Sequence, residues 1–499
     1  MKSTPAAFFI MLLVCAAASV GAESPVFLNA NQMSIATGQP SLVLMSNGPT
    51  HIPVWSLSGG TVGQSVTGLV TGLPGGCRAV KIEIVVTTTD ATTSAEFEDV
   101  YRVHMEFLHK GRPPVVRQAV FNPAETKPLS GDAQSSGVNA NFAGDLLKIL
   151  ASPNVASKES IVRQYDHEVQ GSSAVKAFVG VANDGPSDAA VIRPVLGSRR
   201  GVVIACGMNP RYGDFDTYHM AASAIDEAIR NCVAVGADPS RIALLDNFCW
   251  GDCERAETLG SLVRASLACY DLAVALGTPF ISGKDSLNNE FSYTDGSGQR
   301  QTIAIPPSLL ISAMGQVADV SRCVTMDLKR AGNLLYLVGE TRDELGGSHY
   351  AFVHGLTGGQ VPTVNVEKAR DIFAAVHRAI SGGLVRACHD LSEGGLAVAA
   401  AEMAFAGGLA AKIDVAAVPV GESSLSARGR LFSESNSRFV CEVEADRAAE
   451  FEKQLGGVAF AKVGQVTADA RLVLNDGAAG LIDADISELK EAWQATLRY

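Results

Sequence analysis

The chain has 499 residues, enough for about three domains, and its 47% hydrophobic against 18% charged residues exclude wholesale disorder. Forty Lys and Arg residues against 52 Asp and Glu residues give a net charge of −12, which disfavours nucleic-acid binding through a basic field. Ten cysteines without paired CxxC arrays exclude a disulfide scaffold and predict reduced thiols.

Residues 1–22 have the layout of a secretory signal peptide. Lys2 precedes an apolar run from Ala6 to Val20, and small residues end the segment at Ala22. No stop-transfer pattern follows, so a membrane anchor is the weaker interpretation. A mis-assigned start, or a leader joined to an unrelated coding sequence, gives the same pattern.

Residues 23–132 form a β-rich segment of unknown function. They are rich in Thr, Val, Ser and Gly, and alternating runs at Val80–Thr87 and Val100–Leu108 predict a small antiparallel domain. Residues 133–176 are predicted to be a linker and docking segment, which begins in a Ser-, Gly- and Asn-rich stretch.

Beyond the linker, helical and strand patterns alternate, as in α/β or α+β domains. Two units are predicted, 177–325 and 326–499, because the strand-like run Asn333–Gly339 begins a second alternating series.

The run Ala221–Val235 predicts an amphipathic helix. Glu227 and Asn231 lie four residues apart on another face of it, with Cβ atoms roughly 5–6 Å apart. A carboxylate and an amide oxygen at that spacing suit Mg²⁺. A solvated polar face explains the same spacing without a metal.

The run Arg241–Asp246 predicts an apolar strand that ends in an acid. An acid at the carboxyl end of a strand faces the crevice where many α/β sheets bind ligands. Asp246 is therefore a candidate site residue, although a turn-forming or capping Asp is equally common.

The run Pro279–Ser286 predicts a second strand that enters a polar loop. Gly283 permits close backbone approach, Lys284 suits phosphate, Asp285 suits a divalent metal and Ser286 can donate to a phosphoryl oxygen. The spacing differs from that of a Walker A loop. A plain polar turn is the alternative.

Three further polar segments are predicted to be turns: Gly346–Ser348, His389–Gly395 and Ser433–Ser435. The second offers an acid and a base beside a glycine pair, and Ser392 within it could cap the helix that follows. A Ser-His-Asp triad is not supported, because no nucleophile elbow is present.

Eight segments occur in a fixed order between about Phe142 and Tyr499: Ala151–Lys158, Gln164–Glu168, Asn183–Ala190, Asn209–Tyr212, Gly283–Ser286, Gly346–Ser348, His389–Gly395 and Phe432–Arg438. Together they resemble the phosphoribosylformylglycinamidine synthase family, the ATP-dependent amidotransferases of purine biosynthesis. The resemblance is to the C-terminal half of the large synthetase subunit.

The resemblance implies a mixed α+β and α/β fold, in which a domain pair similar to aminoimidazole ribonucleotide synthase follows the small β-rich segment. In the family this pair occurs twice, in pseudo-twofold arrangement, with nucleotide sites between the pairs. By resemblance, Asp246, Gly283 and Ser286 contact ATP or substrate phosphates. Glu227, Asn231 and Asp285 are then the Mg²⁺ ligands. Shorter family members carry Asn at the position of Lys284, which shifts the expected metal ligand to Asp285.

The implied activity is that of an ATP-dependent C–N ligase, with ATP and Mg²⁺ as cofactors. It converts formylglycinamide ribonucleotide to the amidine with ammonia from a glutaminase subunit or domain. The family's catalytic histidines lie in a first half that has no counterpart here, so no catalytic residue is assigned. We expect activity with a first-half chain or in a homodimer.

The resemblance also implies a cytoplasmic enzyme without nucleic-acid or membrane partners, which conflicts with the leader-like N-terminus. A different class of function is a non-catalytic nucleotide-binding or scaffold protein of the same fold, exported by that leader. A related synthase, such as selenophosphate synthase or thiamine-phosphate kinase, is the enzymatic alternative.

Overall fold

The computed structural model describes residues 40–45, 52–57, 88–89, 96–97, 116–122, 127–130, 142–421 and 424–499. It separates two units, 1–116 and 117–499. The leader-like residues 1–22 lie outside the described residues, as do the predicted strands Val80–Thr87 and Val100–Leu108.

The first unit contains two short antiparallel pairs. Strand β1 (Pro40–Met45) pairs with β2 (Ile52–Leu57), and β3 (Thr88–Thr89) pairs with β4 (Glu96–Phe97). Antiparallel pairing is the kind of sheet that the alternating sequence of residues 23–132 predicts.

An extended strap, residues 117–130 where described, belongs to the second unit. The Val120 amide donates to Ala256 O at 2.9 Å, and Ser130 exchanges backbone hydrogen bonds with Thr357. These contacts place residues 117–130 with the domains that follow, ahead of the boundary expected at residue 132.

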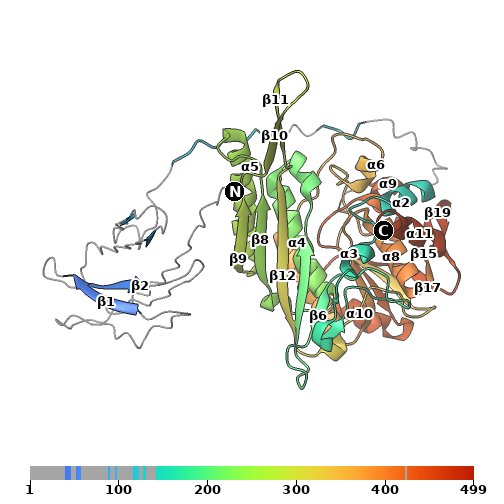
Figure 1. Ribbon diagram of the computed structural model, residues 1–499. Helices are drawn as coiled ribbons and strands as arrows, with labels where there is room; N and C mark the ends of the chain where they lie inside the picture. Colours follow the sequence, from blue (N-terminus) through green and yellow to red (C-terminus); the bar gives the residue numbers. More distant parts are fainter. Residues whose placement is uncertain are drawn as a thin grey trace. The chain divides into compact units, whose positions relative to one another are not determined.

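The first sheet of the second unit has six strands in the order β5-β6-β7-β12-β8-β9 (Figure 1). Only β8 and β9 pair in parallel, and the hairpin β10–β11 extends from the loop between β9 and β12. The strands are β5 Ser173–Val175, β6 Ala190–Ile192, β7 Gly201–Gly207, β8 Ala243–Cys249, β9 Phe280–Ser286, β10 Glu290–Thr294, β11 Arg300–Ala304 and β12 Ser308–Val317.

The second sheet has seven strands in the order β14-β16-β13-β17-β15-β18-β19. Its strands are β13 Leu334–Val338, β14 Val385–Asp390, β15 Ala410–Asp414, β16 Phe439–Val443, β17 Phe460–Thr467, β18 Arg471–Asp476 and β19 Ala479–Asp485. The helices around it are α2 Ala143–Leu150, α3 Glu159–Val162, α6 His349–Val353, α7 Val366–Ser381, α8 Gly395–Gly407, α9 Ala427–Phe432, α10 Ala448–Gln454 and α11 Ile486–Ala495.

The predicted helix is present as α4 (Thr217–Ala234). Its predicted amphipathic character is wrong, because α4 is buried on all sides. Every residue from Met220 to Ala234 is buried. One side of α4 packs on β7 and β12 of the first sheet, and other sides contact α7 and β14 of the second domain. A helix enclosed in this way keeps no solvent face.

The predicted loops after Asp246 and after Gly283 are also wrong, because both segments are strand. Strand β8 continues to Cys249, and β9 continues through Ser286 in parallel register with it, so that Asp246 lies opposite Gly283. Parallel pairing along β8 keeps the polar run at Gly283–Ser286 extended.

Helix α5 (Ala256–Leu276) has the length and apolar composition of a membrane-crossing helix, and 28% of its most apolar window is buried. It packs against α4. A long helix that lies on a sheet passes the same test of length and composition.

We predict that Gly207→Ala lowers the free energy of unfolding by about 1–3 kcal/mol, the usual cost of overpacking a core. A Cβ at Gly207 would clash with Ala224 O of α4 and would lie 2.8 Å from Ala228 N. Urea denaturation followed by tryptophan fluorescence measures the change. Gly197→Ala is the matched control, because a Cβ there meets nothing within 4 Å. Equal midpoints for the two variants would contradict the packing of α4 on β7.

Candidate functional site

Glu227 and Asn231 both lie on α4 and are only 8% and 9% exposed, so the solvated-face interpretation is wrong. Glu227 Oε2 accepts hydrogen bonds from Met208 N at 3.0 Å and Asn209 Nδ2 at 2.6 Å. Asn231 Nδ2 donates to Cys206 O at 3.1 Å. Both side chains therefore hold the end of β7 and the residues after it.

Asp246, Gly283, Lys284, Asp285 and Ser286 lie on the paired strands β8 and β9, and β9 is the edge of the first sheet. A Cβ at Gly283 would stand 2.7 Å from Asp246 Oδ2, so a larger residue here would displace the Asp246 carboxylate. Lys284 Nζ donates to Ser286 Oγ. Burial, and then the charge of Asp285, raise the pKa of Asp246.

The structure places Asp285 on β9, apart from Glu227 and Asn231 on α4, so the three predicted metal ligands do not share one site. Strands β12 and β8 separate β7 from β9. Three strand spacings amount to about 14 Å. One ion bound inside this chain therefore cannot use both sets of side chains.

A second acidic cluster, which the sequence does not predict as a unit, joins Asp188 to the end of β14. Ligand atoms of Asp188, His389 and Asp390 lie within 4.8 Å of one another. His389 Nδ1 lies 2.8 Å from Asp188 Oδ1, and Nε2 lies 3.0 Å from Glu402 Oε2. Burial acts to lower the pKa of His389, but these two carboxylates raise it well above its usual value. A protonated His389 is a donor to both acids.

Asp390 is tied to α4 through Arg230. Its Oδ2 accepts from Arg230 Nε at 3.0 Å and from Ser392 Oγ at 2.6 Å. Ser392 therefore does not cap α8, whose N-cap is Gly394 in a left-handed conformation with φ of 77°. The short Asp390–Ser392 bond takes the place of the predicted cap.

Acids outnumber cations around this cluster. Burial, and then the charge of Glu393, raise the pKa of Glu227 well above its usual value. Burial is also the main cause of the raised pKa of Glu393 and of Glu402. A raised carboxyl pKa means that each charge is unfavourable in its surroundings, so the cluster would gain from an added cation.

Glu434 joins the three predicted polar turns to one another and to Tyr212 in the segment Asn209–Tyr212. Its Oε2 accepts from Tyr212 Oη at 2.6 Å, and its Oε1 accepts from the His349 and Gly394 amides at 2.8 and 2.7 Å. Ser348, next to His349, caps α6 through its hydroxyl. The turns around 210, 347, 394 and 434 therefore form one buried assembly.

Sequence reasoning missed Asp188 and Glu434 as single residues, although both lie in segments that carry the resemblance. Asp188 stands 201 positions from His389 along the chain. The fixed order of the eight segments was the one available signal for these two residues. It indicates the family's fold, and that fold brings distant side chains into one site.

Two family models match the chain. Residues 157–316 match the FGAR-AT PurM_N-like domain, and residues 330–477 match the C-terminal domain of AIR synthase related proteins. These ranges correspond to the two sheets of the second unit.

Curated relatives are PurL subunits of phosphoribosylformylglycinamidine synthase. The subunit from Deinococcus radiodurans is 35% identical over 390 residues, which are 77% of this chain and 49% of that protein. The subunit from Alkaliphilus metalliredigens is 33% identical over 403 residues, 80% of this chain and 51% of that protein. The chain spans about half the length of the curated relatives it matches.

Solved structures of PurL from Thermotoga maritima share the fold. The structure complexed with FGAR gives a TM-score of 0.53 at 17% identity, over 70% of this chain and 53% of that chain. The structure complexed with ADP gives a TM-score of 0.52 at 18% identity, over 71% of this chain and 52% of that chain. The predicted fold, a pair of domains similar to aminoimidazole ribonucleotide synthase, is confirmed. With its two sheets, its ordered segments and these relatives, the chain is a homologue of about half of the PurL subunit of phosphoribosylformylglycinamidine synthase.

Proposed function

We propose that this chain supplies the second half of an ATP-dependent ligase that converts formylglycinamide ribonucleotide to its amidine, and that it acts with a first half. The observation that carries the proposal is the acidic cluster of Asp188, His389 and Asp390, with the buried Glu227 of α4 close enough to Asp390 to feel its charge. Such a set of carboxylates suits a Mg²⁺ ion in a synthetase of this family. The names of the relatives support the reaction, and none supports the non-catalytic, exported alternative.

The residues present fit a magnesium ion. Asp188 Oδ2 is buried and has no hydrogen-bond partner among the described residues. We infer that Asp188 and Asp390, with Glu227 and Asn231 from α4, would supply its oxygen ligands. His389, whose Nδ1 lies 2.8 Å from Asp188 Oδ1, would orient Asp188. When bound, Mg²⁺ neutralises charge on phosphoryl oxygens.

We infer that the edge at β9 is a second, nucleotide-facing site. Asp246, Gly283, Lys284 and Ser286 would contact phosphates there, and Asp285 would bind the Mg²⁺ that accompanies them. A cation and a hydroxyl beside a glycine suit phosphate oxygens. The edge strand has no neighbour beyond β9 among the described strands, so we propose that another half completes the site.

The surface beside this edge supports a protein partner. Apolar side chains of α5 and β9 are largely exposed, with Leu267 at 48%, Tyr270 at 67%, Val274 at 66% and Ile281 at 59%. Leu267, Tyr270 and Val274 recur at helical spacing along α5, and an exposed apolar helix face is typical of an interaction site. A first-half chain, or a second copy of this chain, would cover it.

The proposed chemistry balances in two steps. The terminal phosphoryl group of ATP passes to the amide oxygen of formylglycinamide ribonucleotide, and ADP leaves. Ammonia then attacks the amide carbon, and phosphate leaves with that oxygen. The two steps fit the solved PurL complexes with FGAR and with ATP. The solved PurLQS assembly from Thermotoga maritima fits ammonia from a glutaminase partner. A cytoplasmic location accords with these substrates.

We predict that Mg²⁺ stabilises the chain by about 2.7 kcal/mol at a concentration about 100-fold above its Kd, and that Glu227→Gln removes most of this gain. Thermal unfolding with MgCl₂, against NaCl at matched ionic strength, measures it. Asp469→Asn, whose side chain is 60% exposed, should keep the full gain. An equal gain in Glu227→Gln and in the wild type would exclude Glu227 from the metal site.

We predict no substrate-dependent phosphate release from the chain alone with Mg-ATP, formylglycinamide ribonucleotide and ammonium, and release once a first-half PurL chain is added. In the mixture, Asp285→Ala should lower turnover at least about tenfold, in the range typical of metal-site changes, while Asp469→Ala should not. Turnover by the chain alone would contradict the missing-half proposal. If the rate of turnover by the chain alone rose with the square of the chain concentration, a homodimer would be indicated.

A further inference from the structure

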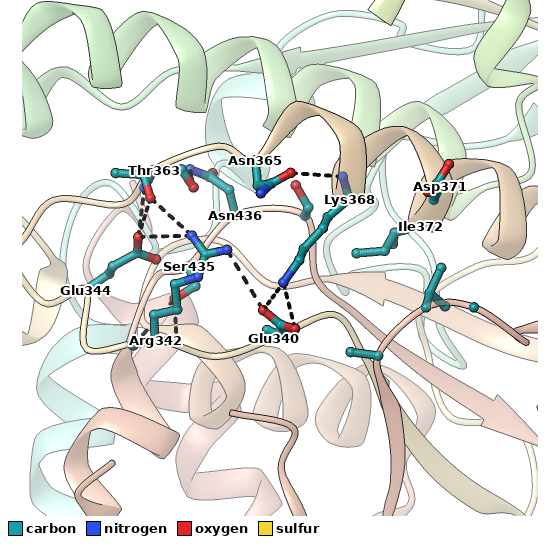
Figure 2. Close-up of a pocket in the computed structure, with 14 residues that line it drawn as sticks. Glu340, Arg342, Glu344, Thr363, Asn365, Lys368, Asp371, Ile372, Ser435 and Asn436 are labelled. Carbon is teal, nitrogen blue, oxygen red and sulfur yellow. Dashed lines mark hydrogen bonds and ion pairs between the residues drawn. The ribbon is translucent and has the colours of Figure 1, made fainter. Parts of the chain in front are cut away.

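A separate pocket of about 130 Å³ lies in the second domain, between the N-terminal part of α7 and the loop at 435–437 (Figure 2). Its floor is formed by Glu344, Ser435 and Asn436, and its rim by Asn365, Lys368 and Asp371. It shares no lining residue with the acidic cluster or with the β9 edge. Neither the fold nor the proposed reaction uses it.

Glu344 leaves one carboxylate oxygen unpaired at the floor. The side chain is only 2% exposed as a residue, and its Oε1 accepts from Thr363 N at 3.0 Å and Thr363 Oγ1 at 2.7 Å. Its Oε2 is buried and has no hydrogen-bond partner among the described residues. An acceptor buried without a partner is costly, so the pocket favours a ligand that brings a donor.

Arg342 leaves donors unpaired beside it. Its Nη1 donates to Thr363 Oγ1 at 3.2 Å, while its nitrogens stand 3.9 Å from the carboxylates of Glu344 and Glu340. Figure 2 shows the guanidinium between these two acids. At 3.9 Å neither contact is a hydrogen bond, so Nη2 is open to an acceptor.

Lys368 neutralises Glu340 beside the pocket, whereas Asp371 adds an acidic group to the rim. Lys368 Nζ donates to both oxygens of Glu340 at 2.9 and 2.8 Å, which leaves Glu340 satisfied. Apart from Asp371 at the rim, the groups without a hydrogen-bond partner are one acceptor, Glu344 Oε2, and one cationic donor, Arg342 Nη2. A bare cation would be repelled by Arg342, and a simple anion by Glu344.

The volume limits the ligand to a small molecule. Pockets that bind drug-sized ligands have volumes of about 300–1,000 Å³, larger than this pocket. A closed apolar cavity of about 150 Å³ holds a benzene-sized ligand. About six non-hydrogen atoms fit the pocket by that comparison. A small zwitterion whose opposite charges are close together matches both the size and the charges.

We propose that this pocket binds a free α-amino acid. Its ammonium group donates to Glu344 Oε2, its carboxylate accepts from Arg342, and its side chain points to the open rim at Asn365 and Asp371. The proposal is independent of the reaction assigned above, because it uses none of the same residues.

Calorimetric titration of the full chain with L-alanine, L-serine, L-glutamine and L-glutamate tests the proposal. We expect saturable binding of at least one of them. For L-alanine, two analogues separate the charges: L-alaninamide lacks the carboxylate, and N-acetyl-L-alanine lacks the ammonium. If L-alanine binds, each analogue should bind at least about tenfold more weakly, since a charged hydrogen bond is lost. If another amino acid binds in its place, its own amide and N-acetyl derivatives serve.

Variants connect the binding to the pocket. Arg342→Gln should weaken the amino acid at least about tenfold, and Arg342→Lys should restore part of the affinity. Arg471→Gln, at an exposed pair with Asp483, should bind like the wild type. Thermal unfolding with and without Mg²⁺, measured on the same preparations, shows whether each variant is folded. It also shows whether the proposed metal site fails independently of the proposed amino-acid pocket. No saturable binding in a folded wild type, or equal binding by Arg342→Gln, would overturn the proposal.

Discussion

Arg230 links the two domains of the second unit at the centre of α4. Its guanidinium donates to Asp226 one turn earlier and to Asp390 on the opposite domain at 3.0 Å, and all three side chains are buried. Asp226 in turn accepts from the Ser437 amide at 2.9 Å. Removal of one member of a buried ion pair typically costs about 3–5 kcal/mol. The acidic cluster therefore keeps its geometry only while α4 lies between both sheets.

Much of the fold could be predicted from the sequence, because alternating strands and helices and the ordered segments both indicate two α/β-type domains. The surroundings of individual helices and strands could not be predicted from the sequence. The pattern of α4 shows an apolar face, but nothing in its spacing reveals that a second domain covers the other face. Likewise, Gly283–Ser286 has turn-forming residues, and only the neighbouring β8 keeps it extended.

The candidate site was predictable in part. Glu227 and Asn231 are near neighbours on one helix, as their spacing requires, and Asp246 lies opposite Gly283. The other side chains of each candidate site come from distant parts of the chain, however. A local sequence pattern cannot show that they lie together. Asp285 and the pair Glu227 and Asn231 are all predicted to be metal ligands, and only the fold shows that they lie on different elements. Glu434 is predicted to be part of a turn, although it joins Tyr212, His349 and Gly394.

The apolar surface of α5 and β9 has a consequence for handling the protein. Two copies that meet through this surface bury apolar area, while the net charge of −12 keeps copies apart at low ionic strength. Added salt screens that repulsion within roughly 10 Å at 0.1 M but leaves the hydrophobic attraction intact. Self-association of the isolated chain is thus expected to rise with ionic strength, and a partner that covered α5 would increase its solubility.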